Sequence, residues 1–142
     1  MAKAIRDNAS DPSGVDVHVR CRRTHRSVAD GLHEVADAVA LHEDDTPDDA
    51  PPYELASLIV ERLAARSPTS VCVWIDDVHV LADLTARESG GVLRDLVDDL
   101  PTNAHLAMVG RRLPPLPLPR LVAADECLQV DRTSLLFDEN EQ

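Results

Sequence analysis

The clearest feature of the hydrophobic pattern is one uninterrupted apolar run, Val71–Ile75, which ends in the carboxylates Asp76 and Asp77. A short continuous run of this kind, bounded by the turn-forming residues 67–70, is typical of a strand buried on both faces of a parallel sheet. Carboxylates are costly to bury, so the two aspartates are expected at the open carboxyl end of that strand. In open α/β sheets, ligands bind at this end.

The rest of the pattern predicts strands that alternate with helices. Residues 15–21 alternate apolar and polar positions, which predicts an edge strand with one wetter face. Apolar residues recur at helical spacing after Ser27, which can cap a helix. The predicted elements are strands at 15–21, 71–76, 104–109 and 126–130, and helices at 27–41, 53–66 and 88–100.

Strands that alternate with helices predict the α/β class with a mostly parallel sheet. The 142 residues fit one domain that can bury a core, and its core must be aliphatic because the chain has only three aromatic residues of the Phe, Tyr and Trp types. The acidic, proline-containing segment 43–52 is expected to be an exposed loop.

The formal net charge is −12, which argues against direct binding of DNA or of an anionic membrane by this segment. No apolar run is long enough to span a bilayer, and the first residues lack the apolar core of a signal peptide. Cys21, Cys72 and Cys127 are odd in number and widely spaced. They are expected to be reduced, buried thiols of a cytoplasmic protein.

An apolar strand that ends in Asp-Asp has the pattern of a Walker B segment. In such a segment the first aspartate holds Mg²⁺ on a nucleotide phosphate, and the second acidic group orients a water molecule. The alternative is a buried strand that simply runs into an acidic turn.

Arginines cluster at the end of the first predicted strand and just after it, at Arg20, Arg22, Arg23 and Arg26. Guanidinium groups suit phosphate, so an anion site is one interpretation. A solvated loop that balances nearby acid is the other, and the base rate of basic surface clusters favours it. His18, on the same strand, is expected to face solvent.

Five pieces of the second half of the chain resemble the ATPase domain of STAND-type P-loop NTPases, above all that of large LuxR-type transcriptional regulators of the MalT-like kind. In order they are an Asp-Asp-His strand end, a helix that ends in Leu-Pro, a strand that ends in an arginine, a Pro/Leu-rich loop, and a Leu-Phe entry into a helix. They span 73–81, 93–101, 106–111, 113–121 and 135–141.

The resemblance implies an ATP-driven signalling switch with a mostly parallel, three-layer sheet, in which 15–21, 71–76 and 104–109 are parallel neighbours. It implies ATP and Mg²⁺ as cofactors. By resemblance, Asp76 is the Mg²⁺ ligand, Asp77 its catalytic acidic neighbour, and Arg111 the sensor arginine that contacts the phosphates, with Arg112 a weaker candidate. The two aspartates are expected close to Arg111.

One departure from the family is large. The 142 residues contain no Gly-x-x-x-x-Gly-Lys-Ser/Thr loop, and Lys3 is the single lysine. Residues 2–9 resemble the helix that follows such a loop, so the sequence predicts an incomplete NTPase domain over 1–142, without the first strand and the phosphate loop. It is expected to hydrolyse ATP negligibly, to bind nucleotide weakly, and to self-associate or depend on the remainder of a larger regulator.

Three other functions match some of the same residues. A response-regulator receiver needs a lysine at a later strand end, which this chain lacks. A hydrolase that pairs Asp77 with His79 lacks a nucleophile in a recognisable turn. A protein-interaction domain that uses the proline-rich segment 113–119, beside Arg112, is the alternative kept.

Overall fold

The computed structural model describes residues 14–40, 46–88, 91–114, 116 and 118–124. These residues fall into two compact units, one that ends at Leu116 and one that contains helix α6 (Leu118–Ala123). The predicted strand at 126–130, the helical residues 2–9, the helix entry after residue 135 and Cys127 lie outside the described residues. None of the described helices is both long and apolar enough to cross a membrane.

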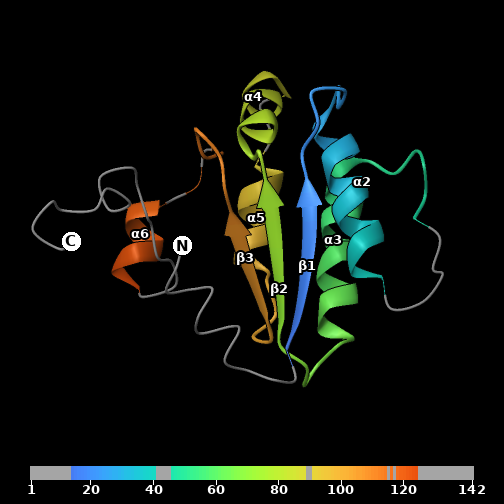
Figure 1. Cartoon of the computed structure of the whole chain (residues 1–142), viewed down its shortest axis with the longest axis vertical. Coiled ribbons are helices and arrows are strands. Elements are labelled where there is room, and N and C mark those ends of the chain that lie inside the picture. The colour runs from blue at the N-terminus through green and yellow to red at the C-terminus, as the bar shows by residue number, and fades with distance from the viewer. Residues whose placement is uncertain (1–13, 41–45, 89–90, 115, 117, 125–142) are drawn as a thin grey trace, which may run out of the picture. The chain divides into compact units, whose positions relative to one another are not determined.

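The larger unit contains a parallel sheet of three strands among its described residues, β1 (Val15–Arg20), β2 (Val71–Asp76) and β3 (Ala104–Met108). Strand β2 lies between the other two and pairs in parallel with both (Figure 1). The predicted α/β class, the strand order and the parallel pairing are therefore confirmed. Each strand lies within one residue of its predicted bounds, because the apolar runs that define them are short and sharply ended.

One face of this sheet carries the core. In register, Val17 lies beside Val73 and Val73 beside Leu106, so side chains at alternate positions form one apolar surface. Helices α2 (Val28–Val39), α3 (Pro52–Ala64) and α5 (Val92–Asp98) contribute buried residues to the same cluster. Figure 1 shows α3 and α5 behind the sheet. The connections from β1 to β2 and from β2 to β3 run in the same direction across the sheet. Because parallel crossovers share one hand, the helices of both connections lie on the same face of the sheet.

The described part of this unit thus shows a sheet and one helical layer. A helical layer on the opposite face, which the three-layer prediction requires, stays a prediction. On that face the exposed His18 stacks on Trp74 with ring centroids 5.9 Å apart. The expectation that His18 is a solvent-facing strand residue is confirmed.

Helix α2 is closed at both ends by side chains. Ser27 caps its first turn as predicted, and the carboxylate of Asp30 accepts hydrogen bonds from the backbone of Arg26 and Ser27. These bonds, the one from Arg26 first, lower the pKa of Asp30. At the other end, Arg62 of α3 donates to the carbonyl of Ala36 at 2.6 Å. The sequence did not predict this second contact.

One helix prediction is wrong in part. A helix was predicted at 88–100, but α5 covers only Val92–Asp98, and a separate helix, α4 (His79–Glu88), precedes it. Helix α4 was missed because, in the sequence, Val80 and Leu81 extend the apolar pattern of the central strand. The chain instead turns at Asp77, and the buried Leu81 and Leu84 lie on the inner face of α4.

Two loop regions differ in detail from the sequence-based expectations. In the loop before α3, Pro47, Asp48 and Asp49 are exposed, but Thr46 and Ala50 are buried and anchor it. The four prolines in segment 113–119 predict an extended chain, yet α6 already begins at Leu118. Proline is tolerated in the first turn of a helix, where its missing N–H would have no helical partner.

Candidate functional site

A sharp turn after β2 presents two carboxylates at the open end of the sheet. Asp76 ends the strand and is exposed, and Asp77 adopts a left-handed backbone conformation with φ of 53°. Aspartate tolerates this conformation better than most residues, because its short side chain can hydrogen-bond locally. The Oδ1 atom of Asp76 accepts a hydrogen bond from the backbone N–H of Asp77 at 2.9 Å. The carboxylate of Asp76 is thereby held at the carboxyl end of the central strand.

The chain that leaves β3 packs tightly against this turn. The N–H of Val109 donates to the carbonyl of Ile75, and the N–H of Val78 donates to the carbonyl of Val109, each at 2.9 Å. Gly110 follows, and a Cβ atom placed there would lie 2.9 Å from the backbone nitrogen of His79. Only glycine fits this approach without a shift of the backbone.

Arg111 emerges beside the first residue of α4. Its terminal nitrogen Nη2 lies 3.3 Å from His79 Nε2, and its backbone nitrogen lies 3.4 Å from His79 Nδ1. A neutral imidazole has one acceptor nitrogen, so it can accept only one of these two hydrogen bonds. His79 thus orients Arg111 at the end of β3.

Asp76, Asp77 and Arg111 line one groove of about 750 Å³, as expected for residues at the carboxyl ends of neighbouring parallel strands. Their proposed roles remain predictions. Arg112, the weaker candidate, is absent from the described lining and forms an ion pair with Asp83 at 2.8 Å. The full lining is Arg20, Cys21, Arg22, Arg23, Asp76, Asp77, His79, Val80, Val109, Gly110 and Arg111.

Arg20 contacts the acidic turn directly, a contact that the sequence did not predict. It ends β1 at the register position of Asp76, and its Nε donates to Asp77 Oδ2 at 2.9 Å. This hydrogen bond, followed by the negative charges of Asp77 and Asp76, raises the pKa of Arg20. Arg20 thus balances part of the acid at the turn, while the anion-site interpretation of the arginine cluster stays a prediction. The signal in the sequence was its position at the end of a strand parallel to the Asp-Asp strand.

The turn between β1 and α2 is held by a half-buried histidine. His25 Nδ1 accepts a hydrogen bond from the backbone N–H of Arg22 at 3.1 Å, so this tautomer carries its proton on Nε2. Nε2 lies 3.1 Å from a carboxylate oxygen of Glu34 on α2. The contact with α2 thereby fixes the turn that carries Arg22 and Arg23.

Cys21 and Cys72 are both buried, as expected. Burial, helped by the negative charges of Glu34 and Asp77, raises the pKa of Cys21 from 9.0 to about 11. The Cys21 thiol is therefore protonated near neutral pH and is a poor nucleophile, although it lines the groove.

The raised pKa of Cys21 predicts a loss of stability at alkaline pH. Because the unfolded thiol ionises near pH 9 and the folded thiol near pH 11, its contribution is complete below pH 9 and falls as the pH rises through this window. At pH 10 the free energy of unfolding is expected to be lower by about 1.4 kcal/mol on this account. Urea titrations at pH 8 and pH 10 measure this loss of unfolding free energy. A Cys21→Ala variant should show a pH-induced loss smaller by this amount, and equal losses in both proteins would contradict the prediction.

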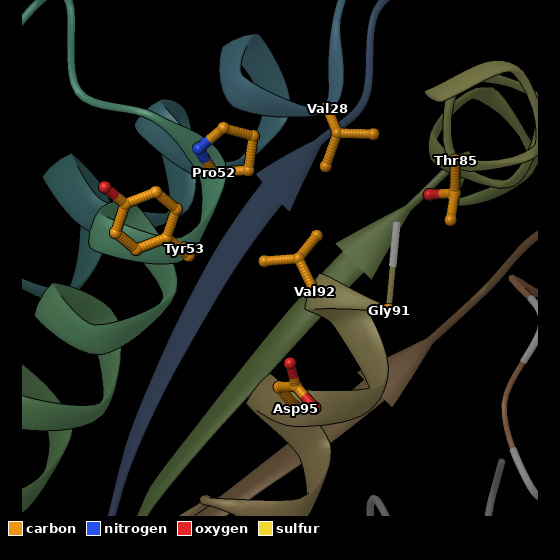
Figure 2. Close-up of a pocket in the computed structure, with 7 residues that line it drawn as sticks. All are labelled: Val28, Pro52, Tyr53, Thr85, Gly91, Val92 and Asp95. Carbon is orange, nitrogen blue, oxygen red and sulfur yellow. The ribbon is translucent and has the colours of Figure 1, made fainter. Parts of the chain in front are cut away.

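A second cavity, of about 310 Å³, lies among the helices (Figure 2). Its walls come from the first turns of α2, α3 and α5 and from α4: Val28, Pro52, Tyr53, Thr85, Gly91, Val92 and Asp95. The hydroxyl of Thr85 donates to the carbonyl of Leu81 at 2.7 Å, so its hydrogen is not offered to a ligand. Asp95 is the acidic residue of the lining. Such a mostly apolar wall, without converging polar groups, supports no specific chemistry.

The chemistry of the donor set restricts what the first groove can hold. Within the described ranges, no group of three or more His, Cys, Asp or Glu side chains is arranged to hold a metal ion. Mg²⁺, however, is commonly bound by one or two carboxylates, with phosphate oxygens and water as its other ligands. Asp76 and Asp77 fit this partial donor set. The hydrolase alternative is weaker still, because Asp77 lies in the turn and His79 on a helix, not together on one strand.

No protein-family model matches the chain, and no curated protein matches it either.

Proposed function

We propose that the groove at the end of β2 binds Mg²⁺ together with the phosphates of ATP, and that the chain is part of the ATPase module of a LuxR-type transcriptional regulator. The observation that carries this proposal is the meeting of Asp76, Asp77 and Arg111 in one groove, at the ligand-binding end of a parallel sheet. The family part of the proposal rests on the five sequence pieces described above.

The geometry suggests a role for each residue. Oδ1 of Asp76 is bonded to the backbone of Asp77, so Oδ2 is the oxygen offered to a metal ion. Asp77 is held by Arg20, which fixes its carboxylate in place for orienting a water molecule. Arg111, oriented by His79, supplies positive charge to a phosphate from the neighbouring strand. Bound Mg²⁺ would neutralise phosphate charge between them.

Nucleotide affinity is expected to be low in these 142 residues. A phosphate loop supplies backbone N–H groups and a lysine to the phosphates, and this sequence contains no such loop. Two carboxylates repel a triphosphate unless a metal ion bridges them. We therefore expect millimolar affinity for Mg-ATP at best, about 4 kcal/mol of binding free energy, and negligible hydrolysis.

Calorimetric titration with Mg-ATP tests the proposal. Asp76→Asn is expected to weaken binding at least tenfold, because it removes a charged metal ligand. Asp49→Asn, which makes the same charge change in the exposed loop before α3, should leave the affinity within a factor of two. If the two variants changed the Mg-ATP affinity equally, the assignment of the metal site to Asp76 would be wrong. Micromolar binding abolished by the Asp76 variant would instead show that the chain builds a nucleotide site without a phosphate loop.

The partner part of the proposal rests on β3. It is an outer strand in the described part of the sheet, and an outer strand can pair with another strand. We infer that this edge joins the chain to another copy or to the remainder of a larger regulator. The interaction alternative has no support from a specific observation: Pro114 is buried, and Leu113 and Leu116 pack against the core.

A further inference from the structure

Arg20 is oriented in a way that leaves most of its hydrogen-bonding capacity unused. Its Nε atom is bonded to Asp77, and no further hydrogen bond of Arg20 is found among the described residues. A guanidinium has five N–H groups, so four of them, on the two terminal nitrogens, remain for another acceptor. The side chain is 73% exposed, and its hydrogen bond to Asp77 restrains it at Nε. An arginine held in this way is prepared to bind a second anion.

Two more arginines line the same side of the groove. The backbone around Arg22 and Arg23 is held by His25, whose ring joins the turn to Glu34 on α2. Arg22 lies 3.9 Å from Glu34, a distance beyond a hydrogen bond. Arg23 makes no ion pair within the part of the chain that the structure describes, and its side chain is exposed. These guanidiniums are thus close to solvent on a fixed backbone.

The charge of the groove differs in sign from that of the chain. Four arginines and two aspartates line it, which gives a formal charge of +2 with His79 neutral, whereas the whole chain carries −12. Clustered charge of one sign attracts the opposite ion, and guanidiniums match phosphate geometry with paired N–H groups. The groove volume of about 750 Å³ exceeds that of a single ion. A ligand with two or more phosphates fits these properties better than a lone metal ion.

We propose that Arg20, Arg22 and Arg23 form a phosphate-binding subsite on the β1 side of the groove, and that it takes a diphosphate or triphosphate group. Asp77 acts within it as the positioning residue for Arg20. The subsite deepens the proposed function, on which it rests for the identity of the natural ligand. Binding of phosphate by the arginines themselves requires no metal ion.

Titration with inorganic pyrophosphate in the presence of EDTA tests the subsite. Without metal, the wild-type chain is expected to bind pyrophosphate with an affinity that falls steeply as salt is added. Arg20→Gln and Arg23→Gln should each weaken binding about threefold to tenfold, and the double variant more than tenfold. Arg94→Gln is the matched control, because Arg94 is exposed on α5, outside the groove lining, and the charge change is the same. It should change the affinity by less than twofold.

Two results would overturn the subsite: no pyrophosphate binding in EDTA, or equal weakening by the Arg94 and Arg23 variants, which would show a non-specific charge effect. The side chains of Arg20, Arg23 and Arg94 are exposed, so the variants are expected to fold normally. Circular dichroism of each variant checks this. Failure of the subsite is distinct from failure of the proposed function. If Asp76→Asn abolishes Mg-ATP binding while the Arg20 and Arg23 variants bind pyrophosphate normally, the metal site stands and the subsite is wrong.

Discussion

Replacement of Arg62 by methionine is expected to lower the free energy of unfolding by about 3 kcal/mol. Only 7% of Arg62 is exposed, and its Nη1 donates to the carbonyl of Ala36 at 2.6 Å and to Thr46 Oγ1 at 2.8 Å. The last carbonyls of a helix have no partner within the helix and carry its negative dipole end. Arg62 satisfies one of them in α2. Methionine retains an apolar stem of similar size but leaves these buried oxygens without this donor.

Arg66, four residues after Arg62 and just beyond the end of α3, provides the matched control. It donates to the carbonyls of Val39 and Ala40 at 3.2 and 3.1 Å, also at the end of α2, but it is only half-buried. Water can replace its hydrogen bonds, so Arg66→Met is expected to cost about 1 kcal/mol. Urea denaturation of both variants measures the difference. Equal losses would contradict the claim that burial makes Arg62 the more important of the two.

Gly110→Ala is expected to lower the free energy of unfolding by about 2–3 kcal/mol. The added methyl would lie 2.9 Å from the backbone nitrogen of His79 and 3.1 Å from that of Val78. These backbone atoms belong to the turn after β2 and the start of α4, so relief of the contact requires the strand end and the turn to separate. The substitution should therefore also weaken ligand binding in the groove.

Gly91→Ala is the control for this change, because a Cβ atom at Gly91 meets no atom within 4 Å. Gly91 precedes the first turn of α5 with φ of −89°, which alanine can adopt. Its cost is expected to stay below about 1 kcal/mol. Thermal and urea unfolding of the two variants give the comparison. A Gly110→Ala protein as stable as the Gly91→Ala protein would show that β3 does not need its close approach to the turn.

Local pattern was sufficient to predict the sheet, because each strand had a short apolar or alternating run with a clear end. The central position of β2 followed from the apolar character of both its faces, and the edge position of β1 from its alternation. Helix α4 could not be found in this way. It begins two residues after Asp77 without a capping signal, and the left-handed backbone of Asp77 that separates it from β2 has no mark in the sequence.

The site was predictable where it depends on strand ends and unpredictable where it depends on register. Asp76, Asp77 and Arg111 lie at or just beyond the ends of the neighbouring strands β2 and β3, so parallel pairing brings them together. The ion pair of Arg20 with Asp77 requires that β1 and β2 end at the same level, which only the structure fixes. Arg62 was missed for a related reason. An arginine on an amphipathic helix normally faces solvent, and the sequence does not show that the end of α2 lies against it.

The most direct test of the central claim is to locate bound metal–nucleotide by NMR. With substoichiometric Mn²⁺ and excess ATP, paramagnetic broadening is expected to be strongest for the amides of 76–80 and 109–111, and for Cys21 on the adjacent strand end. A chain with net charge −12 also offers other carboxylates to a metal ion, such as the exposed Asp48 and Asp49. Broadening centred on that loop, with the amides of 76–80 unaffected, would show that the groove at the end of β2 is not the metal–nucleotide site.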